Sequence, residues 1–147
     1  MKERIAIASD HAGFKLKESL RAFLAAKGYE VKDFGTNSEE RVDYPLFIRP
    51  AAEAVARGEC SVGIVIGGSG NGEAMVANKV KGIRCAVCWN TESARFAKAH
   101  NNANVIAMGE RLVSEHMAQR AAETWLETAY EGGRHQNRLD EIAEMER

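Results

Sequence analysis

The chain has few cysteines and no long hydrophobic run, and each scarcity excludes a class of protein. Three cysteines are an odd number and too few for a disulfide framework, so reduced thiols are expected. The longest apolar runs, such as residues 62–66, fall far short of the roughly 20 residues that a bilayer-spanning helix needs. The N-terminal segment also lacks the apolar core of a signal peptide. These features predict a cytoplasmic protein without a membrane partner.

An excess of charge of one sign is also lacking. The chain carries 20 basic and 21 acidic residues, for a net charge of −1. Non-specific binding to nucleic acids depends on a basic surface that neutralises phosphates, so no nucleic-acid partner is expected. The 45% of hydrophobic and 28% of charged residues are typical of a globular protein. A length of 147 residues suits one compact domain over residues 1–147.

Two of the cysteines, Cys85 and Cys88, have the spacing of redox and zinc motifs. They lie, however, inside a strand-like segment, and there is no second pair to complete four zinc ligands. Free cysteine often behaves as a small buried hydrophobic residue. We therefore expect both thiols to belong to the core, and no metal site is predicted here.

Short β-branched runs alternate with amphipathic segments of helical period. The expected strands are residues 5–8, 30–34, 62–66, 84–88 and 104–108. The helices expected between and after them include residues 73–80 and 91–100, a long helix capped by Ser114 with the face Met117, Ala121, Trp125 and Ala129, and a last helix after Gly132 and Gly133 that carries Leu139, Ile142 and Ala143. This alternation predicts an α/β fold with five parallel strands covered by helices on both faces.

The second helical segment contains a proline in an unfavourable position. Asp43 and Pro45 are typical of a helix start. Pro50, five residues later, has no backbone donor and clashes with the preceding turn of a helix. We therefore expect Pro50 to kink this helix or to delay its start.

Polar and glycine-rich segments follow three of the expected strands, at the edge of a parallel sheet where ligands bind. They are residues 9–11, 67–73 and 109–111. The glycines of residues 67–72 let backbone N–H groups surround an anion at a helix start. The spacing of these glycines is neither that of a Walker A loop nor that of a dinucleotide-binding fingerprint. Glu73 at that helix start can remove a proton α to a carbonyl, while Ser69 and the N–H groups hold the enediolate oxygen. The alternative for Glu73 is a first-turn carboxylate stabilised by the helix dipole.

Other candidates each have a structural alternative. Asp10 and His11 can be the N-cap and first turn of a helix. His100 precedes the fifth strand and so belongs to the opposite edge of the sheet; it joins the site only from a neighbouring subunit or by an unusual excursion. Arg134 and Arg138 share one helical face and suit a phosphate dianion, or they are a solvated basic turn.

Four segments together resemble the ribose-5-phosphate isomerase B family. They are residues 9–17 (SDHAGFKLK), 67–79 (GGSGNGEAMVANK), 100–104 (HNNAN) and 134–138 (RHQNR), and they occur in the family's order along nearly the whole chain. The resemblance implies a three-layer Rossmann-like sandwich with a C-terminal helix extending from the domain. It also implies a homodimer with active sites at the interface, as well as tetramers in some members. The implied activity is the interconversion of D-ribose 5-phosphate and D-ribulose 5-phosphate without metal or cofactor.

The resemblance also implies the roles of individual residues. Many members carry a cysteine base where this chain has Gly67, and the sequence instead resembles the subgroup whose base is a glutamate, here Glu73. The other catalytic residues implied are Ser69, which stabilises the enediolate with the amides of residues 70–73, and Asp10 and His100, which open the sugar ring. Substrate-binding residues implied besides these are His11, Gly68, Gly70, Asn71, Gly72, Asn101, Arg111, Arg134 and Arg138, of which His11 and the three arginines hold the phosphate.

Two other functions are compatible with the residues. An isomerase of a six-carbon sugar phosphate, allose 6-phosphate or galactose 6-phosphate, needs the same base and a more distant phosphate clamp. A non-catalytic sensor of sugar phosphates needs the anion-binding loop but no base.

Overall fold

The computed structural model describes residues 2–147, which form five strands and six helices. The strands are β1 (Arg4–Ser9), β2 (Glu30–Asp33), β3 (Val62–Gly67), β4 (Cys85–Val87) and β5 (Val105–Gly109). The helices are α1 (Phe14–Ala26), α2 (Pro45–Ala56), α3 (Asn71–Asn78), α4 (Thr91–Ala99), α5 (Glu115–Glu127) and α6 (Arg134–Glu144). All strand pairs are parallel, in the order β2-β1-β3-β5-β4. The expected α/β fold is confirmed.

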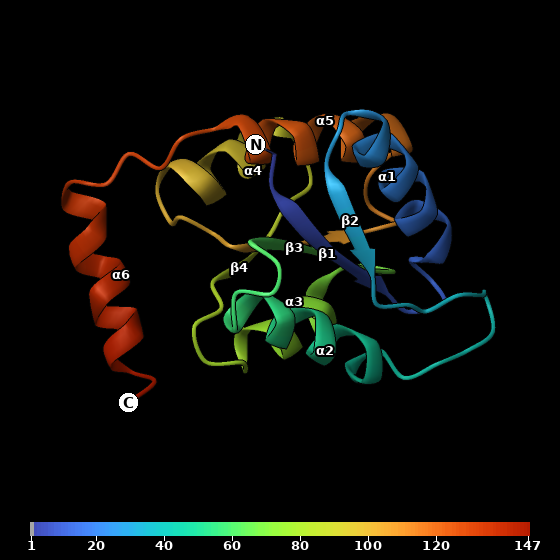
Figure 1. Ribbon diagram of the computed structural model, residues 1–147, viewed down its shortest axis with the longest axis horizontal. Helices are drawn as coiled ribbons and strands as arrows, with labels where there is room; N and C mark the ends of the chain where they lie inside the picture. Colours follow the sequence, from blue (N-terminus) through green and yellow to red (C-terminus); the bar gives the residue numbers. More distant parts are fainter. Residues whose placement is uncertain (1) are drawn as a thin grey trace.

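The sheet is the middle of three layers (Figure 1). Helices α1, α4 and α5 cover one face, and α2 and α3 cover the other. Successive side chains of a strand point to opposite faces, so Ile5 and Ile7 of β1 pack under the first group of helices, and Ala6 and Ala8 pack under the second. Both faces are therefore apolar, as a buried parallel sheet requires.

Most helix starts follow the local signals in the sequence. The Ser114 hydroxyl oxygen accepts a hydrogen bond from the N–H of Met117 at 3.1 Å, which confirms the predicted cap of α5. Helix α4 begins with a capping box, in which Asn90 and Ser93 bind each other's backbone N–H groups. Helix α6 begins at Arg134, directly after the two glycines, as expected.

The predicted start of one helix was wrong, and that of another was confirmed. Helix α3 begins at Asn71, two residues before Glu73, because Gly70 adopts a left-handed conformation (φ 86°) that turns the strand directly into the helix. Helix α2 begins at Pro45, which confirms the start predicted from Asp43 and Pro45. It continues past Pro50 to Ala56, so the alternative of a start delayed by Pro50 was wrong. Pro50 is exposed and only the carbonyl of Leu46, four residues earlier, loses its helical donor.

The buried faces of the last two helices also differ from expectation. In α5 the buried residues are Ala118, Ala121, Ala122 and Trp125, whereas Met117 is half-buried and Ala129 lies beyond the helix end. In α6 Leu139 is buried, but Ile142 and Ala143 are exposed. The reason is visible in Figure 1, where α6 stands apart from the three layers on the β4 side. The predicted extension of the C-terminal helix is confirmed.

The thiols of Cys85 and Cys88 pack on opposite faces of the sheet. Cys88 is buried with the α1, α4 and α5 cluster, and Cys85 packs against the α2 and α3 cluster. Burial raises the pKa of Cys88 to about 12 and raises that of Cys85 as well. Neither thiol is therefore a ready nucleophile or metal ligand near neutral pH.

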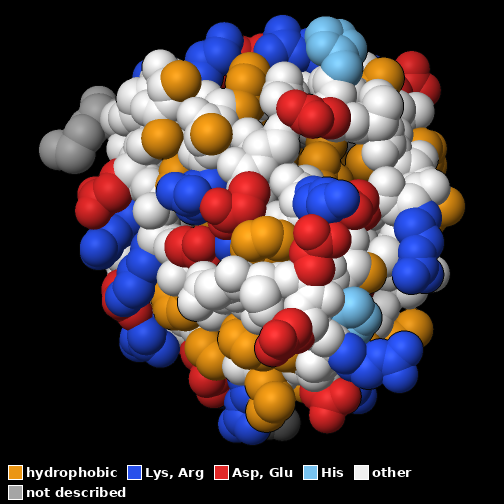
Figure 2. Space-filling model, turned by 90° about the vertical axis from the view of Figure 1, so that its right-hand side faces the viewer, with side chains coloured by type: hydrophobic (Ala, Val, Ile, Leu, Met, Phe, Trp, Pro, Cys, Tyr) orange, Lys and Arg blue, Asp and Glu red, His pale blue; other side chains and the backbone are white. Residues whose placement is uncertain are grey.

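The outer surface beside β2 carries charges of both signs. Figure 2 shows lysine and arginine side chains interspersed with aspartate and glutamate on this face. Ion pairs beside β2 include Arg4 with Glu30 at 3.2 Å, and the fully buried Lys17 with Asp33 at 2.8 Å. None of the helices within residues 2–147 combines the length and the apolar character that crossing a membrane would require.

Candidate active site

The strands that carry the polar and glycine-rich segments are neighbours in the sheet. Ser9 of β1 lies beside Ile66 of β3, and Gly67 of β3 lies beside Gly109 of β5. Their carboxyl ends border a cavity of about 390 Å³. The residues that line this cavity are Asp10, His11, Ala12, Tyr44, Gly68, Ser69, Gly72, Glu73, Arg111 and Leu112. The predicted convergence of these segments at one edge of the sheet is confirmed.

Backbone hydrogen bonds join the loops around the cavity. The N–H groups of Glu110 and Arg111 donate to the carbonyls of Gly67 and Gly68 at 2.8 and 3.0 Å, so the β3–β5 pairing continues past the strands. The Glu110 carboxylate accepts a hydrogen bond from the N–H of Leu16 in the first turn of α1 at 2.8 Å. These bonds hold three separate segments in a common geometry.

The carboxyl group of Glu73 occupies the space above Gly67. A Cβ atom added to Gly67 would lie only 2.2 Å from the Glu73 Cδ atom, so this position admits no side chain while Glu73 keeps its place. Glu73 is 4% exposed. The carboxyl of Glu73 therefore fills the space that a side chain at position 67 would occupy.

The environment of Glu73 makes its carboxylate a stronger base than an ordinary glutamate. Burial raises the pKa of Glu73, the negative charge of Asp10 raises it further, and the residue's own backbone N–H opposes the shift. A carboxylate whose pKa moves toward neutrality is better matched to removing a carbon-bound proton.

Asp10 and His11 lie outside α1, whose N-cap is Gly13. Their alternative assignment as N-cap and first-turn residue was therefore wrong. Asp10 is buried and accepts a hydrogen bond from the N–H of Gly13 at 3.0 Å. The Nδ1 atom of His11 accepts from the N–H of Val42 at 3.2 Å, so a neutral His11 ring carries its proton on Nε2.

The glycine loop offers hydrogen-bond donors beside Glu73. The first-turn N–H groups of Gly72 and Glu73 have no carbonyl partner within α3, and the helix dipole favours an anion there. The Ser69 hydroxyl accepts from the N–H of Asn71 at 3.2 Å, which leaves its own hydrogen free to donate. Arg111 lies over Gly68, since a Cβ atom added there would lie 3.1 Å from its Nη1 atom.

Six of the expected site residues do not line this cavity. Gly70 is buried behind the loop, against the backbone of Met108, and Asn71 faces an adjoining cavity of about 290 Å³. The other four are His100, Asn101, Arg134 and Arg138. His100 is the C-cap of α4, before β5, so it lies at the opposite edge of the sheet, as its place in the sequence predicted.

Sequence reasoning missed Tyr44, Ala12 and Leu112 as cavity residues. The ring of Tyr44 packs on Gly72, where an added Cβ atom would lie 2.6 Å from the tyrosine oxygen. Tyr44 lies in the loop between β2 and α2. The carboxyl end of β2 belongs to the same edge of the sheet as those of β1, β3 and β5, and this was the signal that could have identified Tyr44. A second cavity, of about 400 Å³ and lined by Arg49, Glu53 and Lys79 among others, lies away from the catalytic candidates.

Comparisons with known proteins place the chain in a family. Ribose-5-phosphate isomerase B of Escherichia coli K12 is 45% identical over 144 residues, which cover 98% of this chain and 97% of that protein. The structure of Clostridium thermocellum ribose-5-phosphate isomerase B matches with a TM-score of 0.96 and 50% identity, over 97% of each chain. That of the Mycoplasma genitalium isomerase B with bound ribulose-5-phosphate matches with a TM-score of 0.93 and 38% identity, over 97% of this chain and 95% of that one. Residues 5–142 match the Ribose/Galactose Isomerase family model, and the chain belongs to that family.

Proposed function

We propose that the protein is an aldose-ketose isomerase that interconverts D-ribose 5-phosphate and D-ribulose 5-phosphate. The observation that carries this proposal is the buried carboxyl of Glu73, which lies over Gly67 beside the N–H donors of the α3 start. The similarity to a structure with bound ribulose-5-phosphate favours a five-carbon substrate over the six-carbon sugar phosphates. A sensor would have no use for a buried base.

The first step opens the furanose ring. His100 donates a proton to the ring oxygen while Asp10 takes the proton of the C1 hydroxyl, which leaves an aldehyde at C1. Glu73 then removes the proton from C2, and the charge moves to the oxygen on C1. The Ser69 hydroxyl and the N–H groups of the glycine loop stabilise this enediolate, and Glu73 returns its proton to C1 while the O2 proton moves to O1.

The reaction needs no cofactor because it is internally balanced. C1 is reduced and C2 is oxidised by the same amount, so no hydride acceptor takes part. The developing negative charge meets donors already in place, which is the function that a Lewis acid would otherwise supply.

The phosphate group requires hydrogen-bond donors and positive charge from two directions. His11 and Arg111 lie in the cavity, whereas Arg134 and Arg138 are exposed on α6 at the far side of β4. Because one chain cannot bring the two sets together, we infer a homodimer in which the partner supplies His100, Asn101, Arg134 and Arg138. Exposed apolar side chains support this inference. Leu112 lines the cavity and is 65% exposed, Trp89 lines the adjoining cavity and is 57% exposed, and Met75 of α3 is 66% exposed.

We also infer one domain over residues 1–147 and action in the cytoplasm. The same two apolar clusters include residues from β1 through α5, so no boundary divides this part of the chain. The free thiols of Cys60, Cys85 and Cys88 suit a reducing compartment.

The test is turnover of ribose 5-phosphate by the purified protein without added metal, beside the variant Glu73→Gln. The amide keeps the shape of the carboxyl and removes its basicity, so kcat should fall while sugar-phosphate binding persists. Exchange of solvent deuterium into the sugar should be lost in parallel. Wild-type turnover in Glu73→Gln would refute the assignment of the base, and saturable binding without turnover by the wild type would favour a six-carbon substrate or a sensor.

A further inference from the structure

Two histidines and a glutamate meet outside the cavity, where the linker before α6 passes the end of α4. The Nε2 atoms of His100 and His135 lie 3.8 and 3.4 Å from the same carboxylate oxygen of Glu131. The three ligand atoms all lie within 4.8 Å of one another. Three side chains from two helix ends and a connecting loop thus converge on one small volume.

The spacing of these atoms suits a small divalent ion. Zinc binds imidazole nitrogen and carboxylate oxygen at about 2.0–2.2 Å, and the ligands of a tetrahedral site then lie about 3.3–3.6 Å apart. Two of the three separations, 3.4 and 3.8 Å, are already near this value. Two histidines and one carboxylate leave a fourth position for water.

The protein scaffold holds the cluster together before an ion binds. The N–H of Glu131 donates to the carbonyl of Ala99 at 3.0 Å, which fixes the linker against the end of α4. The rings of His100 and His135 stack with centroids 4.5 Å apart and planes at 14°. Binding of one ion by both Nε2 atoms requires the rings to turn out of this stack about χ2, which is a broad torsion for histidine.

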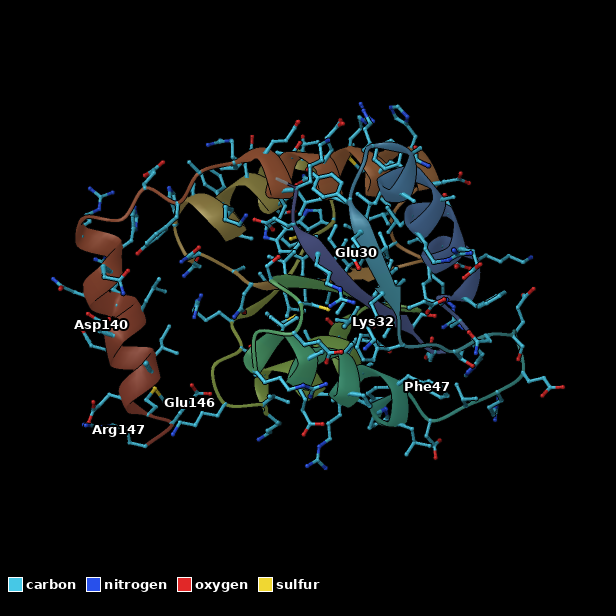
Figure 3. The ribbon with its side chains drawn as sticks, viewed as in Figure 1. Glu30, Lys32, Phe47, Asp140, Glu146 and Arg147 are labelled. Atoms are coloured by element: carbon cyan, nitrogen blue, oxygen red, sulfur yellow. The ribbon has the colours of Figure 1, made fainter. Side chains whose placement is uncertain are left out.

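The cluster of His100, Glu131 and His135 is accessible to solvent on the side of Glu131. The side chain of Glu131 is 56% exposed, whereas that of His135 is 13% exposed. An ion can therefore enter from the glutamate side. In Figure 1 this linker runs from α5 to α6, away from the carboxyl edge of the sheet that holds Glu73. Figure 3 shows Asp140 further along α6, and Glu146 and Arg147 beyond the end of that helix, toward the C-terminus.

We propose that His100, Glu131 and His135 form a binding site for a transition-metal ion such as Zn²⁺. The ion carries two positive charges to a carboxylate and two neutral imidazoles, the ligand types that zinc accepts. Neither Cys85 nor Cys88 competes for the ion. Cys85 is half-buried and Cys88 is buried, and they pack in the two apolar clusters on opposite faces of the sheet.

The ion has a consequence for catalysis that rests on the proposed function. A metal ion on Nε2 of His100 takes the lone pair that carries the proton for ring opening. It also restrains His135, the neighbour of Arg134 in the first turn of α6. The bound ion therefore inhibits isomerisation from the cyclic sugar, and a chelator restores it.

The binding test uses the full-length protein after treatment with a chelator, and Co²⁺ as the probe. Tetrahedral Co²⁺ absorbs visible light strongly, and ligation by nitrogen and oxygen gives no thiolate charge-transfer band. We expect one Co²⁺ per chain, displaced by Zn²⁺. Loss of a group that only hydrogen-bonds to a metal-ligating side chain weakens metal binding by about 10–100-fold. Loss of a ligating side chain itself should therefore raise Kd at least as much.

The variants are Glu131→Gln and His135→Asn, with His116→Asn as the matched control. His116 is an exposed histidine at the start of α5, outside the cluster, and its replacement should leave Kd unchanged. Glu131→Gln preserves the size of an exposed side chain, so it tests the site without endangering the fold. Absence of saturable Co²⁺ binding, equal Kd in all four proteins, or a thiolate band would overturn the proposal.

Isomerase assays with and without Zn²⁺ then test the inhibition separately. Inhibition of the wild type that Glu131→Gln relieves supports the link to His100. Stoichiometric Co²⁺ binding together with Zn²⁺-insensitive turnover would overturn that link and leave the metal site standing. If the wild type shows no turnover even without metal, the proposed function fails, and the spectroscopic result is unaffected.

Discussion

Replacement of Gly67 by alanine should remove activity without removing the substrate-binding groups. The new Cβ atom would lie 2.2 Å from Cδ of Glu73, whereas ordinary contacts begin at 3.4 Å. The carboxyl must therefore retreat by about 1.2 Å. A misplacement of about 1 Å costs on the order of 100-fold in rate, which is about 2.7 kcal/mol of activation free energy. We expect kcat to fall by this factor with KM nearly unchanged.

The matched control is Gly63→Ala, four residues earlier in β3 and on the same face of the sheet. Its Cβ atom would approach Val55 Cγ2 at 3.2 Å, a side-chain contact that can relax by a few tenths of an ångström. This variant should lose a little stability in denaturant unfolding and keep wild-type kcat. Both variants fold if their circular dichroism and unfolding m-values match those of the wild type.

A double variant, Gly67→Ala with Glu73→Asp, tests whether the two side chains compete for the same space. Glu73→Asp shortens the side chain by one methylene and opens the space that the Gly67→Ala methyl group needs. The two substitutions together should lose less activity than the product of their separate effects, because they act on the same contact. Wild-type kcat in Gly67→Ala, or independent effects in the double variant, would refute the placement of the base over Gly67.

Four further predictions follow from the burial of Glu73, the cap of α5 and the exposed apolar residues. Because the pKa of Glu73 is raised, the acid limb of the pH profile of kcat/KM should lie above the pKa of an ordinary glutamate. Asp10→Asn should move that limb to lower pH, because it removes the negative charge beside Glu73. A limb that stays in place in Asp10→Asn would contradict this electrostatic assignment. The raised pKa also affects stability, because the folded protein favours the protonated carboxyl of Glu73. Glu73→Gln should therefore stabilise the protein increasingly as pH rises from the pKa of Glu73 in the unfolded chain to its raised pKa in the folded protein. Thermal unfolding at several pH values measures this effect. Ser114→Ala should cost about 1 kcal/mol in urea unfolding by removing the α5 cap, with kcat unchanged. Met75→Arg should leave the fold intact but dissociate the proposed homodimer in sedimentation and abolish turnover, and an active monomer would refute a shared site.

Local sequence signals determined which elements form and in what order. Strand-length apolar runs and caps such as Ser114 depend on residues within one turn of each other, so they can be read without the rest of the chain. The position of catalytic candidates at strand ends also followed, because parallel strands bring their carboxyl ends to one edge. The expected distance of His100 from that edge came from the same rule.

Tertiary structure alone decided how those residues meet. The carboxyl of Glu73 lies over Gly67 because α3 begins two residues earlier than its pattern suggested, which rotates Glu73 toward the end of β3. Tyr44 reaches the cavity through a loop whose course no local pattern specifies.

The meeting of His100, Glu131 and His135 likewise depends on how a linker crosses the end of α4. Secondary structure is encoded by neighbours in the chain and is therefore visible in the sequence. Contacts between distant segments depend on the packing of whole elements, which only the folded molecule specifies.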